Sequence, residues 1–222
     1  MDRVAFDFAA ARNRMVDGQI RPNRVFDPRI IAAMREIPRE LFLPPRLRPL
    51  AYIDEDIQLG GGRVLMEPLA IARLVQLLSP VEGERALVVA AGVGYGAALL
   101  AACGVRVIAL EEDPGLLGLA QVALDGIAPS VRLVSGPLAA GWPAEAPYDM
   151  ILLEGAVRQI PPALGQQLRA DRGRLATVRV EPGAVGQMVL AEPTPAGLSA
   201  QPMFDCATPP IPSLLPKPGF VF

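Results

Sequence analysis

The chain has 222 residues, 51% of them hydrophobic, and carries a formal net charge of −2 with an isoelectric point near 5.3. This length suits one domain with an added subdomain, and the weak negative charge gives no electrostatic reason to expect a nucleic-acid or membrane partner. Histidine is absent and only two cysteines are present, which excludes histidine-based triads and leaves no basis for a metal site. The sequence has neither a long apolar run nor a secretory signal, so we expect a cytoplasmic protein.

Residues 1–68 are predicted to form an N-terminal helical cap followed by a glycine loop. Apolar residues recur at helical spacing between Phe6 and Gly18. Asp27 followed by Pro28 is typical of a helix start, and this second helix is expected to end before Pro38.

The glycine loop is expected over residues 51–68, because the three consecutive glycines 60–62 would lose much conformational entropy inside a helix or strand. Arg63 and Glu67 are the polar residues of its second half. They lie four positions apart, so Arg63 could pair with Glu67, or it could hold a substrate carboxylate through two parallel hydrogen bonds.

Residues 69–222 alternate predicted helices and strands, beginning with a helix over 69–78. This alternation predicts a parallel sheet covered by helices on both faces, with the last two strands forming an antiparallel edge. The strands are expected over the apolar run from residue 86, then over 105–110, 131–134, 149–154, 173–180, 186–191 and 197–204. The end of the chain is rich in proline, and Phe204, Phe220 and Phe222 are expected to pack across the sheet edge.

The stretch from Ala86 to Ala101 is the centre of this pattern. Its apolar run turns at Gly92 and Gly94 and resumes as an alanine/leucine run, which predicts a buried strand, a tight turn and the start of a helix. Glycines allow a ligand to approach the main chain, and a helix N-terminus presents unpaired N–H groups. Because the next predicted strand ends at Glu111, the stretch describes a mononucleotide-binding unit whose acid accepts hydrogen bonds from a ribose.

The order of several further motifs identifies a family resemblance. The segments that carry it are 34–44, 51–54, 60–68, 92–95, 141–143, 147–149, 160–168 and 173–175. Together they resemble the protein-L-isoaspartate O-methyltransferase family over roughly residues 12–190. The resemblance implies a doubly wound, mostly parallel S-adenosylmethionine-dependent methyltransferase fold with an N-terminal helical subdomain. It also implies S-adenosylmethionine as cofactor and a protein or peptide carboxylate as substrate.

Carried over residue by residue, the resemblance implies a catalytic loop at Arg63 and Met66. Met66 occupies the position at which the family has a serine or threonine hydroxyl beside the substrate carboxylate. A methionine side chain cannot donate that hydrogen bond, which leaves Arg63 as the candidate to hold the carboxylate.

The resemblance also implies cofactor-binding positions at Gly92, Gly94, Tyr95, Glu111 and Gly136. The family's acidic residue and first glycine of the glycine motif are here Val88 and Ala90, and Pro137 replaces the aspartate on the adenine side. Glu154, at the end of a predicted strand, is a candidate to contact the cofactor from another direction and so compensate for these lost polar side chains.

Three functions therefore remain open. The first is an S-adenosylmethionine-dependent carboxyl methyltransferase, and the second is a non-catalytic relative that keeps the fold for binding. The third is a nicotinamide-dependent oxidoreductase, because Gly92 to Ala97 with Glu111 also fits a loose dinucleotide fingerprint. Oligomeric state cannot be read from the sequence.

Overall fold

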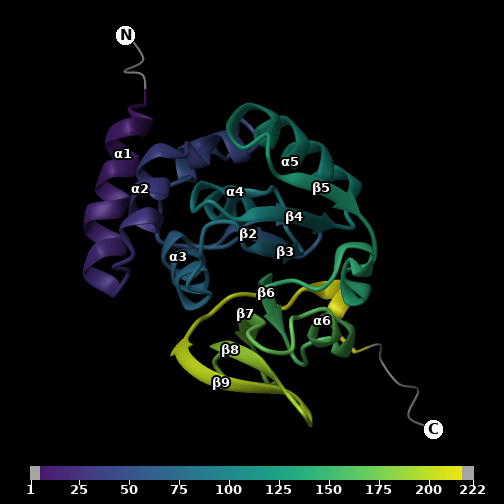
Figure 1. The fold of residues 1–222 in the computed structure, drawn as a ribbon. Helices are drawn as coiled ribbons and strands as arrows, with labels where there is room; N and C mark the ends of the chain where they lie inside the picture. The colour runs from purple at the N-terminus through teal and green to yellow at the C-terminus, as the bar shows by residue number, and fades with distance from the viewer. Residues whose placement is uncertain (1–5, 217–222) are drawn as a thin grey trace, which may run out of the picture.

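A computed structural model describes residues 6–216, in which seven strands form one sheet in the order β5-β4-β3-β6-β7-β8-β9 (Figure 1). Strands β3 to β7 are parallel, and β8 and β9 continue the sheet as an antiparallel edge. This confirms the predicted sheet and its edge. The strands are β3 (Arg85–Val89), β4 (Arg106–Glu111), β5 (Arg132–Ser135), β6 (Met150–Val157), β7 (Arg174–Arg179), β8 (Gln187–Thr194) and β9 (Gly197–Asp205).

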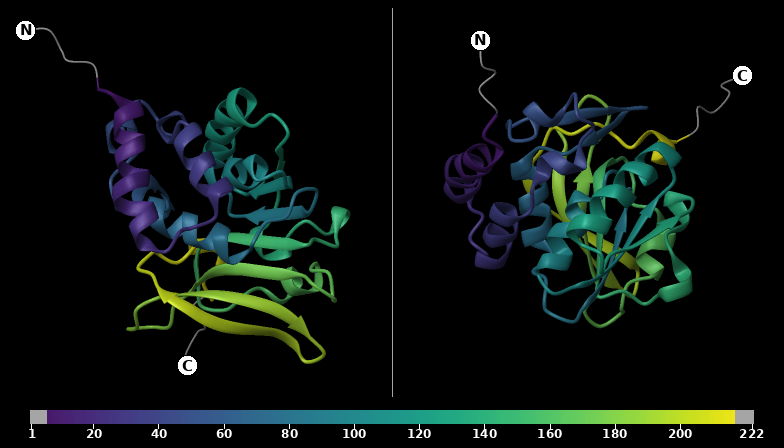
Figure 2. Two further views of the ribbon diagram at one scale, coloured as in Figure 1. Left: turned by 60° about the vertical axis from the view of Figure 1, so that its left-hand side comes forward. Right: turned by 90° about the horizontal axis from the view of Figure 1, so that it is seen from above.

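Helices cover both faces of the sheet, as the two further views show (Figure 2). They are α3 (Pro68–Leu77), α4 (Tyr95–Ala102), α5 (Pro114–Ile127) and α6 (Pro162–Gln166). Strand β3 is buried on both sides: Val88 belongs to one apolar cluster, while Leu87 and Val89 belong to the other. A strand covered on both faces reads as a continuous apolar run, which is the pattern that the sequence shows there.

The N-terminal helical subdomain packs beside α3 and α4. It contains α1 (Phe8–Met15), which continues as a π-helical turn over Val16–Ile20, and α2 (Pro28–Glu36). The Asp27 side chain accepts a hydrogen bond from the N–H of Arg29 at 2.9 Å, so the predicted N-cap is confirmed. Within residues 6–216, no helix combines the length and the apolar character needed to cross a membrane.

The prediction of a loop over residues 51–68 was wrong for part of this segment. Residues Ile57–Gly60 and Arg63–Leu65 form a two-stranded antiparallel hairpin, β1 and β2, outside the main sheet. The three glycines 60–62 all have positive φ and make its turn. The strands form because buried Ile57 and Leu65, which pair across the hairpin, attach it to the core.

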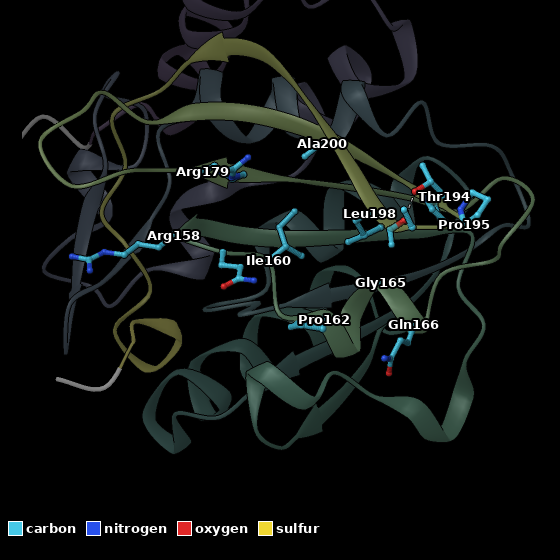
Figure 3. Close-up of a pocket in the computed structure, with 14 residues that line it drawn as sticks. Arg158, Ile160, Pro162, Gly165, Gln166, Arg179, Thr194, Pro195, Leu198 and Ala200 are labelled. Carbon is cyan, nitrogen blue, oxygen red and sulfur yellow. Dashed lines mark hydrogen bonds between the residues drawn. The ribbon is translucent and has the colours of Figure 1, made fainter. Parts of the chain in front are cut away.

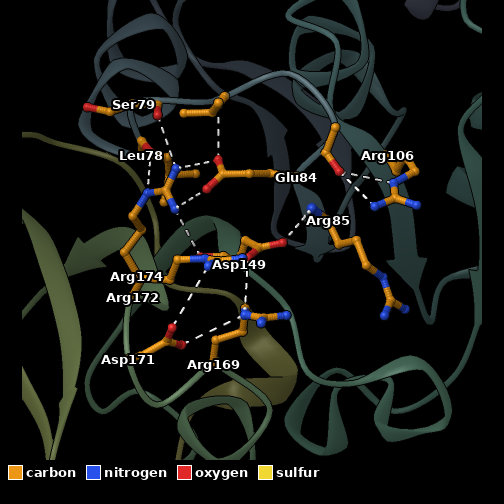
Figure 4. A network of polar contacts seen from close by, with 12 residues as sticks. Leu78, Ser79, Glu84, Arg85, Arg106, Asp149, Arg169, Asp171, Arg172 and Arg174 are labelled. Atoms are coloured by element: carbon orange, nitrogen blue, oxygen red, sulfur yellow. Dashed lines mark hydrogen bonds and ion pairs between the residues drawn. The ribbon is translucent and has the colours of Figure 1, made fainter.

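A polar network fixes the amino-terminal edge of the sheet (Figure 4). The carboxylate of Asp149 accepts hydrogen bonds from the backbone N–H of Arg85 and from Nε of Arg172, both at 3.0 Å. Arg174 spans the same edge and pairs with Glu84, with Nη2 to Oε2 at 2.7 Å. These charged groups join the chain at the starts of β3, β6 and β7, so their role is structural. The candidate site lies at the opposite, carboxyl-terminal edge of the sheet.

The segment that follows β9 returns across the carboxyl end of β6, and Figure 1 shows it in yellow. The N–H of Ile211 donates to the carbonyl of Ala156 at 2.8 Å. Cys103 and Cys206 are free and buried, as expected. Phe204 lies on β9 beneath the Arg73 guanidinium, 4.7 Å from its ring centroid, whereas Phe220 and Phe222 lie outside the described residues.

Candidate functional site

The predicted strand, turn and helix are present at the centre of the sheet. β3 ends at Val89, and Ala90, Gly92 and Gly94 follow with positive φ angles of 57°, 58° and 90°. Gly94 is the N-cap of α4, and a Cβ added to it would lie 2.9 Å from Leu124 Cδ1. Both the backbone angle and the close packing therefore require glycine at this position.

The carboxylate of Glu111, at the end of β4, lies against this turn and is fully buried. Its Oε2 accepts the N–H of Gly92 at 2.7 Å, and Oε1 accepts the N–H groups of Glu112 and Asp113 at 2.9 and 3.0 Å. Arg63 adds two parallel hydrogen bonds, Nη1 to Oε1 at 2.8 Å and Nη2 to Oε2 at 2.9 Å. Since a carboxylate offers about four lone-pair sites, these five donors saturate it.

Arg63 reaches this position from β2, and its side chain is 9% exposed. Its Nη2 also donates to the carbonyl of Ala90 at 2.9 Å, and a Cβ on Gly92 would lie 3.9 Å from the same nitrogen. The guanidinium therefore rests directly on the glycine turn. The alternative pairing with Glu67 is not the one formed, because both ends of the guanidinium are taken by Glu111.

A second buried group surrounds Tyr95. The guanidinium of Arg39 lies over the Tyr95 ring, 4.7 Å from its centroid, and Arg39 also donates from Nε to the carbonyl of Ala51 at 2.8 Å and from Nη2 to that of Met66. Among the described residues, Arg39 Nη1, Tyr95 Oη and Glu154 Oε1 are buried without a hydrogen-bond partner. Sequence reasoning missed Arg39, because segment 34–44 also contains Arg35 and nothing local tells which of the two arginines is buried.

Glu154 comes from β6, and burial raises the pKa of its carboxyl group to about 8. It is therefore mostly protonated at neutral pH and can donate one hydrogen bond. β6 continues past the predicted strand end at Glu154 to Val157. A Cβ on Gly96 would lie 2.3 Å from Glu154 Oε1, so the start of α4 and the middle of β6 meet here.

The remaining predicted residues lie around this centre. Met66 is 2% exposed, and its carbonyl accepts the hydrogen bond from Arg39. Gly136, after β5, donates its N–H to the carbonyl of Glu111 at 3.2 Å, and the exposed Pro137 follows it. The structure thus joins Arg63, Gly92 and Glu111 directly, and it places Gly136 beside them through the backbone.

A cavity of about 670 Å³ lies elsewhere, between α6 and the hairpin of β8 and β9 (Figure 3). Ile160, Leu198 and Ala200 are among its apolar lining residues, and Arg158 and Arg179 lie towards one end. None of the predicted site residues lines it.

Comparison with known proteins decides which family has this arrangement. The sequence model of the family described as protein-L-isoaspartate(D-aspartate) O-methyltransferase matches residues 10–192. The chain belongs to this family. It is 40% identical over 184 residues to a protein-L-isoaspartate O-methyltransferase of Methylorubrum extorquens, an alignment that covers 83% of this chain and 79% of the relative.

Solved structures of the protein-L-isoaspartate O-methyltransferase family share the fold. One such methyltransferase superposes with a TM-score of 0.77 at 22% identity, covering 90% of this chain, which spans 65% of that protein. A Plasmodium falciparum protein described as a putative member, in complex with S-adenosyl-L-homocysteine, superposes with a TM-score of 0.73 at 17% identity, covering 91% and 97% of the two chains.

The protein-L-isoaspartate O-methyltransferase family uses S-adenosylmethionine, and the residues of this chain can be tested against that cofactor. The glycine turn, the helix start and the terminal carboxylate that a nucleoside requires are all built. However, Arg63 occupies the oxygens of Glu111 that would accept ribose hydroxyls. The site can therefore accept the ribose of the nucleoside only when the Arg63 guanidinium has moved away from Glu111.

Proposed function

We propose that the protein is an S-adenosylmethionine-dependent protein carboxyl methyltransferase of the isoaspartyl type, acting on a carboxylate of a protein or peptide. The observation that supports this most directly is the unit of β3, the glycine turn, α4 and β4, which brings the turn and the carboxylate of Glu111 together. Its geometry suits one nucleoside. The oxidoreductase alternative is not favoured, because the family match covers residues 10–192 without a second nucleotide-binding half.

Little acid/base chemistry is required of the protein for this reaction. The cofactor supplies a methyl group on a sulfonium, and a carboxylate acceptor is already ionised at neutral pH. The protein's contribution is to hold the acceptor in line, which in favourable intramolecular cases lowers a barrier by about 7–11 kcal/mol. Gly92, Gly94 and Glu111 would receive the nucleoside, and the protonated carboxyl group of Glu154 can donate one hydrogen bond.

A second candidate function is a non-catalytic relative that keeps the fold for binding. Two observations favour it. Met66 is buried at the position of the family's hydroxyl and cannot donate a hydrogen bond to a carboxylate. In addition, the acceptor sites of Glu111 are filled by the chain's own groups.

A methyl-transfer assay with labelled S-adenosylmethionine and an isoaspartyl peptide tests the proposal. We expect slow transfer by the natural sequence and faster transfer by Met66→Ser, which restores a hydroxyl at that position. Met203→Ser is the matched control, since Met203 is an exposed methionine on β9. Transfer by none of the three proteins to peptide or to protein carboxylates would favour the non-catalytic candidate.

A further inference from the structure

We propose that Arg63 determines whether this chain accepts a nucleoside, because its guanidinium takes the place of the ribose hydroxyls on Glu111. This inference rests on the proposed function and names the residue that controls its cofactor site. Both nitrogens of the Arg63 fork bond to Glu111, at 2.8 and 2.9 Å, and Nη2 also bonds to Ala90 of the turn.

The exclusion follows from hydrogen-bond capacity and from space. All the lone pairs of Glu111 are used, and the carboxylate has no exposed surface, so ribose hydroxyls have no acceptor there while Arg63 stays. The guanidinium also lies within contact distance of Gly92, where a ligand would approach the main chain. Nucleoside binding and the Arg63–Glu111 pair are therefore mutually exclusive.

Arg63 is carried by an element that is separate from the main sheet. The β1–β2 hairpin pairs only within itself in the described residues, and its turn is made of glycines 60–62, which all have positive φ. A small hairpin with a glycine turn can move as a unit, and such a movement would withdraw Arg63 from Glu111 without disturbing β3 or β4.

The C-terminal segment, residues 206–214, holds this hairpin in place (Figures 1 and 2). The Thr208 hydroxyl donates to Asp56 Oδ2 at 2.6 Å, directly before β1. A Cβ on Gly62 would lie 2.8 Å from Pro212 Cγ, so the segment also presses on the hairpin turn. It lies outside the part of the chain that the family model matches, residues 10–192. We therefore infer that this segment stabilises the position of Arg63.

Calorimetric titration with S-adenosylhomocysteine tests the proposal on three full-length proteins: the natural sequence, Arg63→Ser and Thr208→Val. Releasing two charge-assisted hydrogen bonds should tighten binding by Arg63→Ser about tenfold to a hundredfold. Thr208→Val should tighten binding by less, because it loosens the hairpin and leaves Arg63 present. Arg46→Ser is the matched control, an exposed arginine close in sequence, and should bind like the natural protein.

Titrations with adenosine and with 2′,3′-dideoxyadenosine show whether the change in affinity depends on the ribose hydroxyls. The gain in Arg63→Ser should appear with adenosine and vanish with the analogue that lacks ribose hydroxyls. Thermal unfolding with and without S-adenosylhomocysteine checks that Arg63→Ser folds, and Thr208→Val decides the question if it does not.

The outcomes separate this proposal from the proposed function. Equal affinity of the natural protein, Arg63→Ser and Thr208→Val would overturn the role of Arg63 and leave the methyltransferase proposal standing. Tight binding by Arg63→Ser without methyl transfer to any carboxylate would support the role of Arg63 and remove the methyltransferase proposal. Absence of binding in every protein would overturn both.

Discussion

Replacing Glu111 by glutamine tests the buried ion pair at the centre of the site. Glutamine keeps one acceptor oxygen where the glutamate offers two, yet five donors converge on this position from Arg63, Gly92 and the backbone after β4. The amide NH₂ would then face other donors, and the Arg63 guanidinium would lose its counter-ion in a site with little solvent. Breaking such a pair from one side costs about 3–5 kcal/mol.

Equilibrium urea unfolding measures this loss of unfolding free energy directly. In a thermal melt, at about 2–4 °C per kcal/mol for a chain of this size, the melting temperature of Glu111→Gln should fall by about 6–20 °C. Glu112→Gln is the matched control, since the neighbouring side chain makes no hydrogen bond or ion pair with the described residues, and it should stay within about 0.5 kcal/mol. Adding Arg63→Met to Glu111→Gln should recover part of the loss, because the unpaired cation is removed. A loss below about 1 kcal/mol in Glu111→Gln, or one equal to that of Glu112→Gln, would refute the reasoning.

Three other changes have definite expected outcomes. Although burial raises it, the pKa of Asp149 is held below its ordinary value by hydrogen bonds from the Arg85 N–H and Arg172, so Asp149→Asn should cost about 1–3 kcal/mol at neutral pH. This difference should shrink as the pH falls below the ordinary pKa of an aspartate, about 3.9, and disappear once the pH is low enough to protonate the carboxyl group in the folded state as well. Burial raises the pKa of Glu154 to about 8, so the folded state retains a proton that the unfolded state releases above about pH 4.3. Stability should thus fall from about pH 5 to pH 8, and Glu154→Gln should abolish that slope in melts across the range. Gly94→Ala should destabilise by about 1–3 kcal/mol in urea, whereas Gly118→Ala, at an exposed position of α5 with open space around it, should stabilise by about 0.5–1 kcal/mol.

Much of the fold was predictable because its signals are local. The apolar run before Gly92, the glycines of the turn and the acid after the next strand each report a nearby backbone requirement, and all three lie where they were expected. Asp27 followed by Pro28 likewise set the start of α2. The main error lay at the glycines 60–62, where a short hairpin depends on burial against distant residues as much as on its own sequence.

The candidate site was predictable only in part. Arg63 and Glu111 were each singled out, yet 48 positions separate them, and no local pattern says that an arginine will pair with the carboxylate that was predicted to bind a ribose. The i,i+4 spacing of Arg63 and Glu67 suggested a helical pairing, which a β-hairpin cannot present. The contacts of Thr208 and Pro212 with the hairpin span about 150 residues and depend wholly on how the chain returns over β6.

The affinity of the unmodified protein for S-adenosylhomocysteine is the most direct test of a nucleoside site closed by Arg63. Ordinary enzyme–substrate affinities extend down to about 1 μM. With Arg63 in place, a loss of about tenfold to a hundredfold would put the dissociation constant in the range of about 10–100 μM. Calorimetric titration should therefore show weak, saturable heat at high ligand concentration. A dissociation constant near 1 μM for the unmodified protein would contradict the closed site.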